Sequence, residues 1–133
     1  MRKTLILLAL LGAVALTGVA CGSSEDEGAS PTEAVTEIDQ IKAMLDEGLA
    51  QYQAGDKGAA DTTVGDAYLE HFEKVEDALG ERDRELMEDL EHQISTEIRE
   101  EMKDDAAADH VAKLIADTKT DLDIAKTKLH EAD

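Results

Sequence analysis

Apolar residues recur at spacings of three and four through most of this sequence, which is the pattern of helices with one buried face. No stretch alternates with a period of two, as a half-buried strand would. The chain is therefore predicted to be all-α. The four apolar stripes consist of Val35, Ile38, Ile41, Leu45, Leu49 and Tyr52; Ala60, Val64, Tyr68, Phe72, Val75 and Leu79; Leu86, Leu90, Ile94 and Ile98 with Met87 alongside; and Val111, Leu114, Ile115, Leu122, Ala125 and Leu129.

Residues that start and stop helices separate these stripes. The sequence Ser-Pro-Thr-Glu at residues 30–33 is a capping box, with the only proline of the chain at the first helical position. Gly55 and Asp56 end the first helix and cap the second, while Gly80 and Asp83 do the same for the third. The apolar pattern lapses again at residues 103–106. Four helices joined by short turns predict an antiparallel up-down four-helix bundle over residues 31–133.

Residues 1–20 have the features of an export signal. Arg2 and Lys3 precede an apolar run over residues 5–16, and small residues then lead to the single cysteine, Cys21. This arrangement resembles the signal of a bacterial lipoprotein, which implies lipidation of Cys21 and attachment to the extracytoplasmic face of a cell membrane. The alternative is an ordinary secretion signal that is cut after Ala20. Residues 22–30 contain only Gly, Ser, Ala and acidic residues, so residues 21–30 are predicted to be a disordered tether.

The charge balance of the chain bears on the partners that it can bind. The chain carries 32 acidic and 13 basic residues, a net charge of −19. Without Arg2 and Lys3 of the leader, the balance becomes 11 − 32 = −21. A nucleic-acid binder needs a basic face, so we expect no nucleic-acid partner. No catalytic triad, nucleotide loop or paired metal-protease histidines occur in the sequence, so we expect no enzyme.

Two motifs stand in the middle of the chain: residues 49–56 (LAQYQAGD) contain a Tyr-x-x-Gly-Asp turn, and residues 66–76 (DAYLEHFEKVE) contain Ala-Tyr-x-x-x-Phe-Glu-x-x-Glu. This segment resembles the extracytoplasmic helical domain of bacterial high-affinity iron permeases. The resemblance implies an accessory role in the uptake of iron or another hard cation, with an iron permease or another envelope protein as partner. The permeases' Arg-Glu-x-x-Glu membrane helix has no counterpart here, so a permease is excluded. The similarity continues through Arg82-Asp83, Leu86, Leu90-Glu91, Ile94 and Ile98-Arg99.

Candidate metal ligands follow from that segment and from helical spacing. Glu73 and Glu76 are three residues apart on the second helix, and Glu91 and His92 on the third helix are the nearest facing candidates. Glu76 lies at the edge of the buried face, where an unpaired carboxylate is costly and needs Arg99, Lys42 or a metal ion as partner. An ion pair or a solvated acidic face are the alternatives to a metal site. The alternative function is a lipoprotein that binds another envelope protein and holds no metal.

Overall fold

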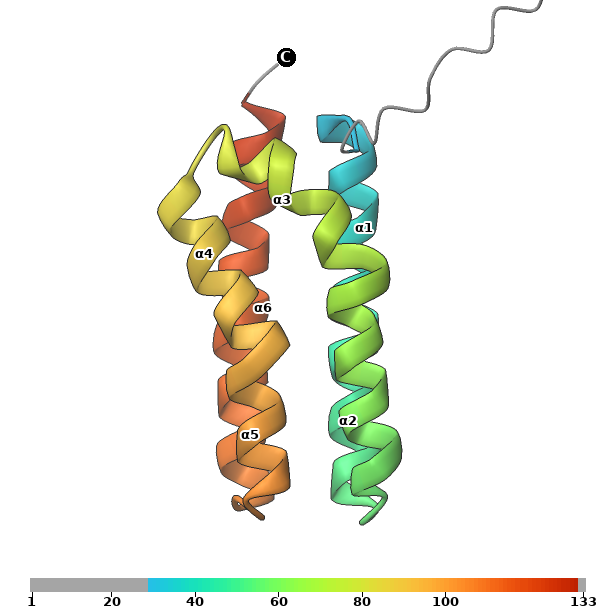
Figure 1. Ribbon diagram of the computed structural model, residues 1–133. Helices are drawn as coiled ribbons and strands as arrows, with labels where there is room; N and C mark the ends of the chain where they lie inside the picture. The colour runs from blue at the N-terminus through green and yellow to red at the C-terminus, as the bar shows by residue number, and fades with distance from the viewer. Residues whose placement is uncertain (1–28, 132–133) are drawn as a thin grey trace, which may run out of the picture.

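The computed structural model describes residues 29–131, and this part of the chain forms four helices and no strand (Figure 1). The first helix is α1 (Pro31–Gln53) and the last is α6 (Ala108–His130). The second helix runs without a break through α2 (Lys57–Asp66), the π-helical segment η1 (Ala67–Phe72) and α3 (Glu73–Gly80). The third consists of α4 (Arg84–His92), the π-helical segment η2 (Gln93–Glu97) and α5 (Ile98–Lys103). The all-α prediction is confirmed.

The predicted caps fix where three of these helices begin. The Ser30 hydroxyl accepts a hydrogen bond from the Glu33 amide, and the Glu33 carboxylate accepts one from the Ser30 amide at 3.0 Å. Asp56 and Asp83 accept from the amides three residues ahead, each at 3.1 Å. Each cap satisfies amides that the first helical turn leaves free. Local chemistry therefore sets the boundaries.

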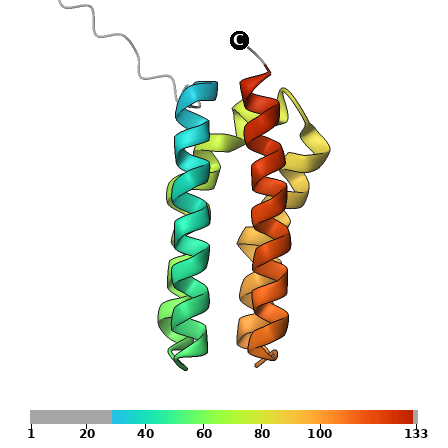
Figure 2. The same cartoon turned by 180° about the vertical axis from the view of Figure 1, so that it is seen from behind.

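Helices α1 and α6 lie side by side over their length (Figure 2). Three lysine–aspartate pairs join them, from Lys126 with Asp39 through Lys42 with Asp123 to Lys119 with Asp46, at 2.5–2.6 Å. The partners on α6 move towards lower numbers as those on α1 move towards higher numbers.

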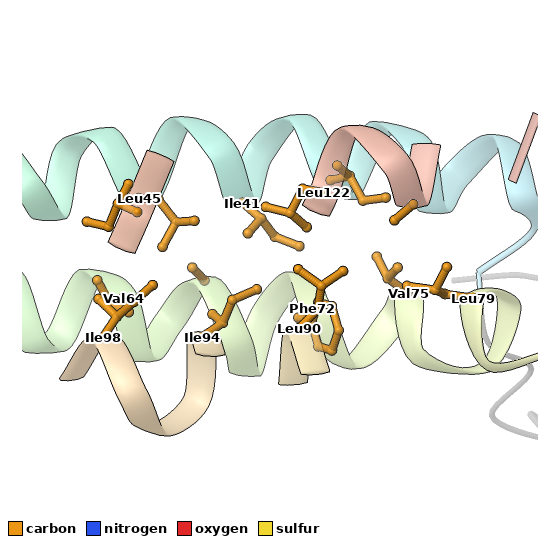
Figure 3. Packing of buried hydrophobic residues seen from close by; sticks show 14 of the residues in the cluster. Ile41, Leu45, Val64, Phe72, Val75, Leu79, Leu90, Ile94, Ile98 and Leu122 are labelled. Atoms are coloured by element: carbon orange, nitrogen blue, oxygen red, sulfur yellow. The ribbon is translucent and has the colours of Figure 1, made fainter. Parts of the chain in front are cut away.

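The core is one apolar cluster drawn from all four helices (Figure 3). Its largest fully buried side chain is Phe72. The one buried polar residue in residues 29–131, Thr118, donates its hydroxyl to the Leu114 carbonyl at 3.0 Å and so leaves no donor unsatisfied. The predicted stripes supply most of the core: Ile38, Ile41 and Leu45; Val64, Phe72, Val75 and Leu79; Leu90, Ile94 and Ile98; and Val111, Ile115, Leu122 and Leu129.

The two π-helical segments were not predicted from the sequence. An α-helix has 3.6 residues per turn, so residues that recur every four positions drift around it by about 40° per step. The buried residues Leu90, Ile94 and Ile98 have that spacing, and η2 lies within it. Ala67 and Phe72, both buried, are five apart and bound η1. The wider π turns return these positions to the core.

Several predictions fall outside the described part of the chain or at its edge. The signal peptide, Cys21 and the tether up to residue 28 lie outside it. Ala29 and Ser30, which the sequence assigned to the tether, contact the bundle: Ala29 donates its amide to the Lys74 carbonyl at 3.3 Å. Across residues 29–131, no helix has the length and apolar character needed to cross a bilayer.

Candidate functional site

The four predicted metal ligands do not all meet. Glu73 on α3 and His92 at the end of α4 are exposed. Glu76 on α3 and Glu91 on α4 are partly buried, and Glu91 lies near enough for its charge to act on the Glu76 carboxyl. Neighbouring residues on a helix point about 100° apart, so Glu91 and His92 cannot face the same point. The structure thus brings together one carboxylate from each helix.

Tyr68 joins these two carboxylates, and sequence reasoning treated it only as a core residue. Its ring packs on Phe72 with ring centroids 6.1 Å apart, which fixes where the hydroxyl lies. The hydroxyl donates a long hydrogen bond to Glu91 Oε1 at 3.5 Å. Burial, together with the charges of Glu76 and Glu91, raises the pKa of the Tyr68 hydroxyl to about 12. The phenol therefore stays protonated at neutral pH and acts as a donor.

Glu76 is the least satisfied carboxylate of this cluster. Its Oε1 atom is buried and has no hydrogen-bond partner, a state shared in residues 29–131 only by Gln93 Oε1. Burial, followed by the charge of Glu91, raises the pKa of the Glu76 carboxyl, while the nearby Tyr68 hydroxyl acts against that rise. Buried acceptors without partners are rare in folded proteins and cost free energy. The site therefore favours a proton or another positive charge at Glu76.

The basic partners considered for Glu76 are both engaged elsewhere. Arg99 binds Asp61 with two hydrogen bonds, Nε to Oδ1 at 2.8 Å and Nη2 to Oδ2 at 3.2 Å. Lys42 pairs with Asp123 on α6 at 2.5 Å. The hypothesis that either residue neutralises Glu76 is wrong.

The donor set suits a hard cation only in part. Glu76, Glu91 and Tyr68 offer oxygen atoms, which are the ligands preferred by Mg²⁺, Ca²⁺, Mn²⁺ and ferric iron. Between Ala29 and Glu131, however, no three His, Cys, Asp or Glu side chains come close enough together to hold a metal ion. Two carboxylates fill a small part of a six- to eightfold shell. A cation bound here would keep several waters.

Two of the four histidines serve as links between elements. His71 Nδ1 lies 2.5 Å from Glu37 Oε2, which connects η1 to α1, and Lys74 Nζ reaches the same carboxylate at 3.4 Å. His110 Nε2 lies 3.3 Å from Glu101 Oε2 at the turn between α5 and α6. Both arrangements bind neighbouring helices together and neither adds to the site at Glu76.

Comparison of the chain with known protein families, with curated proteins and with solved structures finds no match. The functional argument therefore rests on the cluster of Glu76, Glu91 and Tyr68 (the Glu76 cluster) and on the sequence motifs.

Proposed function

We propose that this protein is a lipid-anchored extracytoplasmic module that captures iron or another hard cation and passes it to a membrane partner. The observation that carries the proposal is the buried, unpartnered Oε1 atom of Glu76 beside a second carboxylate, Glu91. No lysine or arginine in residues 29–131 forms an ion pair with either carboxylate. A cation supplies the missing positive charge.

Few protein ligands and a retained water shell imply weak, rapidly exchanging binding. Such binding suits capture and transfer better than storage, because the cation leaves without breaking a closed cage of ligands. The net charge of −21 after the leader concentrates cations around the whole domain and speeds their arrival. The resemblance to iron permease outer domains suggests iron as the cargo and a permease as the acceptor.

The helices are proposed to follow one another in antiparallel, up-down order. Support comes from pairs that link successive helices: Gln51 with Thr63 and Glu37 with His71 between the first and second, and Asp61 with Arg99 and Tyr68 with Glu91 between the second and third. In both cases the partner number falls as the residue number rises. This order places Glu76 and Glu91 on neighbouring helices that run in opposite directions.

Thermal denaturation with added cation tests the proposal. Mn²⁺, or Fe²⁺ without oxygen, should raise the melting temperature of the full chain by an amount that grows with cation concentration. The double variant Glu76→Gln with Glu91→Gln keeps the side-chain shapes and removes both charges, so it should lose most of that rise. Protons compete for the same oxygens, so the rise should also shrink as pH falls towards the carboxylate range near 4.

The matched control changes two exposed acidic residues, one on each helix. Glu70→Gln with Glu85→Gln removes the same amount of charge without touching the Glu76 cluster. It should retain the cation-dependent rise. An equal loss in both double variants would mean that cations act only through the general charge of the surface, and the Glu76 cluster would not be a binding site.

A second candidate function is the binding of another envelope protein with no metal involved. Leu69, on η1, exposes 58% of its surface, and Ile124, on α6, exposes 45%. Large apolar side chains in water contribute favourably when a partner covers them. Association that is lost on Leu69→Ser, in a protein that shows no response to Mn²⁺ or Fe²⁺, would favour this function over cation capture.

A further inference from the structure

A cavity of about 530 Å³ lies at one end of the bundle, next to the Glu76 cluster. Its walls come from the start of α1, the end of α3, the turn that follows α3, and the first half of α4, all of which meet at the same end of the molecule (Figure 1). This volume falls within the range of small-molecule sites in proteins. Two unusual side chains also line the cavity.

The first of these is Arg82. Residues 29–131 contain eleven lysines and arginines, and ten of them lie within 4 Å of a carboxylate. Arg82 is the exception within that range, although acidic residues outnumber basic ones by more than two to one in the chain. Arg82 lines the cavity together with Arg84, whose contact with Glu88 is long, at 3.9 Å, and exposed. Arg82 and Arg84 thus line this space with little neutralisation of their positive charges.

The second unusual side chain is Glu76, which also lines the cavity. It is the carboxylate with the buried, unpartnered oxygen, and Asp77 lies beside it on the wall. The two sets of charges do not neutralise each other, since no ion pair in the described range joins Arg82 or Arg84 to Glu76 or Asp77. The cavity wall therefore carries positive and negative side chains that are not paired with each other.

We propose that this cavity binds a small zwitterion of the amino-acid or short-peptide class. The carboxylate of the ligand pairs with Arg82 and Arg84, and its ammonium group pairs with Glu76 and Asp77. Ala78 and Met87 supply the apolar part of the wall. Guanidinium groups recognise carboxylates through parallel hydrogen bonds, and an ammonium group brings three donors to oxygens that lack them.

Electrostatics favours this class over simpler ions. A small anion would meet Arg82 and Arg84 but would be repelled by a chain of strongly negative charge. A simple cation would pair only with the carboxylates of the wall and would leave Arg82 without a partner. A ligand with one charge of each sign meets both sets of groups and carries no net charge for the protein to repel.

The test uses three related probes and saturation-transfer NMR on the full chain in detergent. Alanyl-alanine carries both charges, N-acetyl-alanyl-alanine carries only the carboxylate, and alanyl-alanine amide carries only the ammonium group. We expect alanyl-alanine to bind at least about fivefold more tightly than either blocked probe, the gain of one added charge pair at a partly exposed site. Equal affinity for all three probes, or no binding of any, would overturn the proposal.

Variants then assign the two ends of the ligand. Arg82→Gln, at an exposed position, should weaken alanyl-alanine by about fivefold and leave the amide probe unchanged. Glu76→Gln should weaken the amide probe and leave the N-acetyl probe unchanged. Lys113→Gln is the control, because its side chain is 74% exposed on α6 and does not line the cavity. Unchanged dipeptide affinity in Arg82→Gln would overturn the proposal.

The proposed zwitterion site and the proposed cation site can be disproved independently of each other. Arg82→Gln should leave the Mn²⁺-dependent rise in melting temperature intact, because Arg82 takes no part in the Glu76 cluster. A protein that binds alanyl-alanine but does not respond to Mn²⁺ would disprove cation capture alone. The reverse result would disprove the zwitterion site alone.

Discussion

Asp61 and Glu76 lie on one continuous helix in opposite electrostatic surroundings. Asp61 accepts two hydrogen bonds from Arg99, and Lys103 lies 3.5 Å from one of its oxygens. The hydrogen bonds from Arg99, followed by the positive charges, lower the pKa of the Asp61 carboxyl. Burial and the charge of Glu91 raise the pKa of the Glu76 carboxyl. Ionisation of the Asp61 carboxyl therefore stabilises the folded state, whereas ionisation of the Glu76 carboxyl destabilises it.

Amide substitutions at these two positions should therefore shift stability in opposite directions. Near pH 7 and without added cation, Asp61→Asn should lower the free energy of unfolding by about 1–2 kcal/mol, because it strands Arg99. Glu76→Gln should raise it by about 1 kcal/mol, because it removes a negative charge that is partly buried beside Glu91. Urea denaturation at several pH values measures both changes.

The pH dependence of the two effects has a defined sign. Unfolded Asp61 binds more protons than folded Asp61, so its contribution is present above its unfolded pKa, near 4, and is lost as pH falls further. The difference in free energy of unfolding between Asp61→Asn and the wild type should therefore disappear at low pH. Folded Glu76 binds more protons than unfolded Glu76, so wild-type stability falls as pH rises from about 4, and the gain of Glu76→Gln should grow with pH. Effects of the same sign in both variants would contradict these environments.

At the scale of the helices, the close contact of α1 with α2 depends on Gly48. A Cβ atom added at Gly48 would lie 2.8 Å from Val64 Cγ2, and Val64 is fully buried. Gly48→Ala should therefore force the two helices apart and lower stability by about 1–3 kcal/mol. Gly58→Ala is the matched control, since its nearest neighbour would be Asp56 Oδ1 at 4.0 Å. This control should leave stability unchanged or raise it by up to about 1 kcal/mol. Thermal and urea denaturation compare the two variants.

Local signals predicted the helices well because each signal acts within a few residues. The caps at Ser30, Asp56 and Asp83 place the helix starts where the structure has them. The π turns were not predicted. The repeated spacing of four in Leu90, Ile94 and Ile98 is the one sequence signal that indicates η2. The same spacing also fits a regular α-helix whose apolar face rotates slowly around its axis. Only the neighbouring helices decide between the two.

The candidate site was predicted less completely because it depends on contacts between helices. Glu76 could be placed at the edge of a buried face from its distance to Phe72. The sequence did not show that Glu76 lacks a basic partner, because this depends on Arg99 pairing with Asp61 on the neighbouring helix. Tyr68 belonged to an apolar stripe, and only the position of the neighbouring helix shows its hydroxyl close to Glu91.

For the whole molecule, the position of the proposed sites relative to the membrane follows from the start of the folded domain. Ala29 lines the cavity and lies eight residues after Cys21 in the sequence. Eight residues span at most about 28 Å, at about 3.5 Å each. If Cys21 carries the lipid, the cavity and the Glu76 cluster are therefore held near the membrane surface. A cation released from Glu76 and Glu91 would have a short path to a membrane protein.

The lipid anchor at Cys21 is the prediction on which this arrangement depends. Residues 21–133 carry a net charge of −21 and are repelled by anionic lipid headgroups, so the protein surface offers no attraction that could replace a lipid chain. An alkyne-tagged fatty acid should label the wild-type protein in cells, and Cys21→Ser should abolish the label and release the protein from the membrane fraction. Ser23→Ala, two residues away, should keep both. Unchanged labelling of Cys21→Ser would disprove lipidation there, and a mature wild-type mass without lipid would favour an ordinary secretion signal cut after Ala20. The proposed transfer of cations would then have to occur in solution, where the low affinity of two carboxylates gives the partner no advantage of proximity.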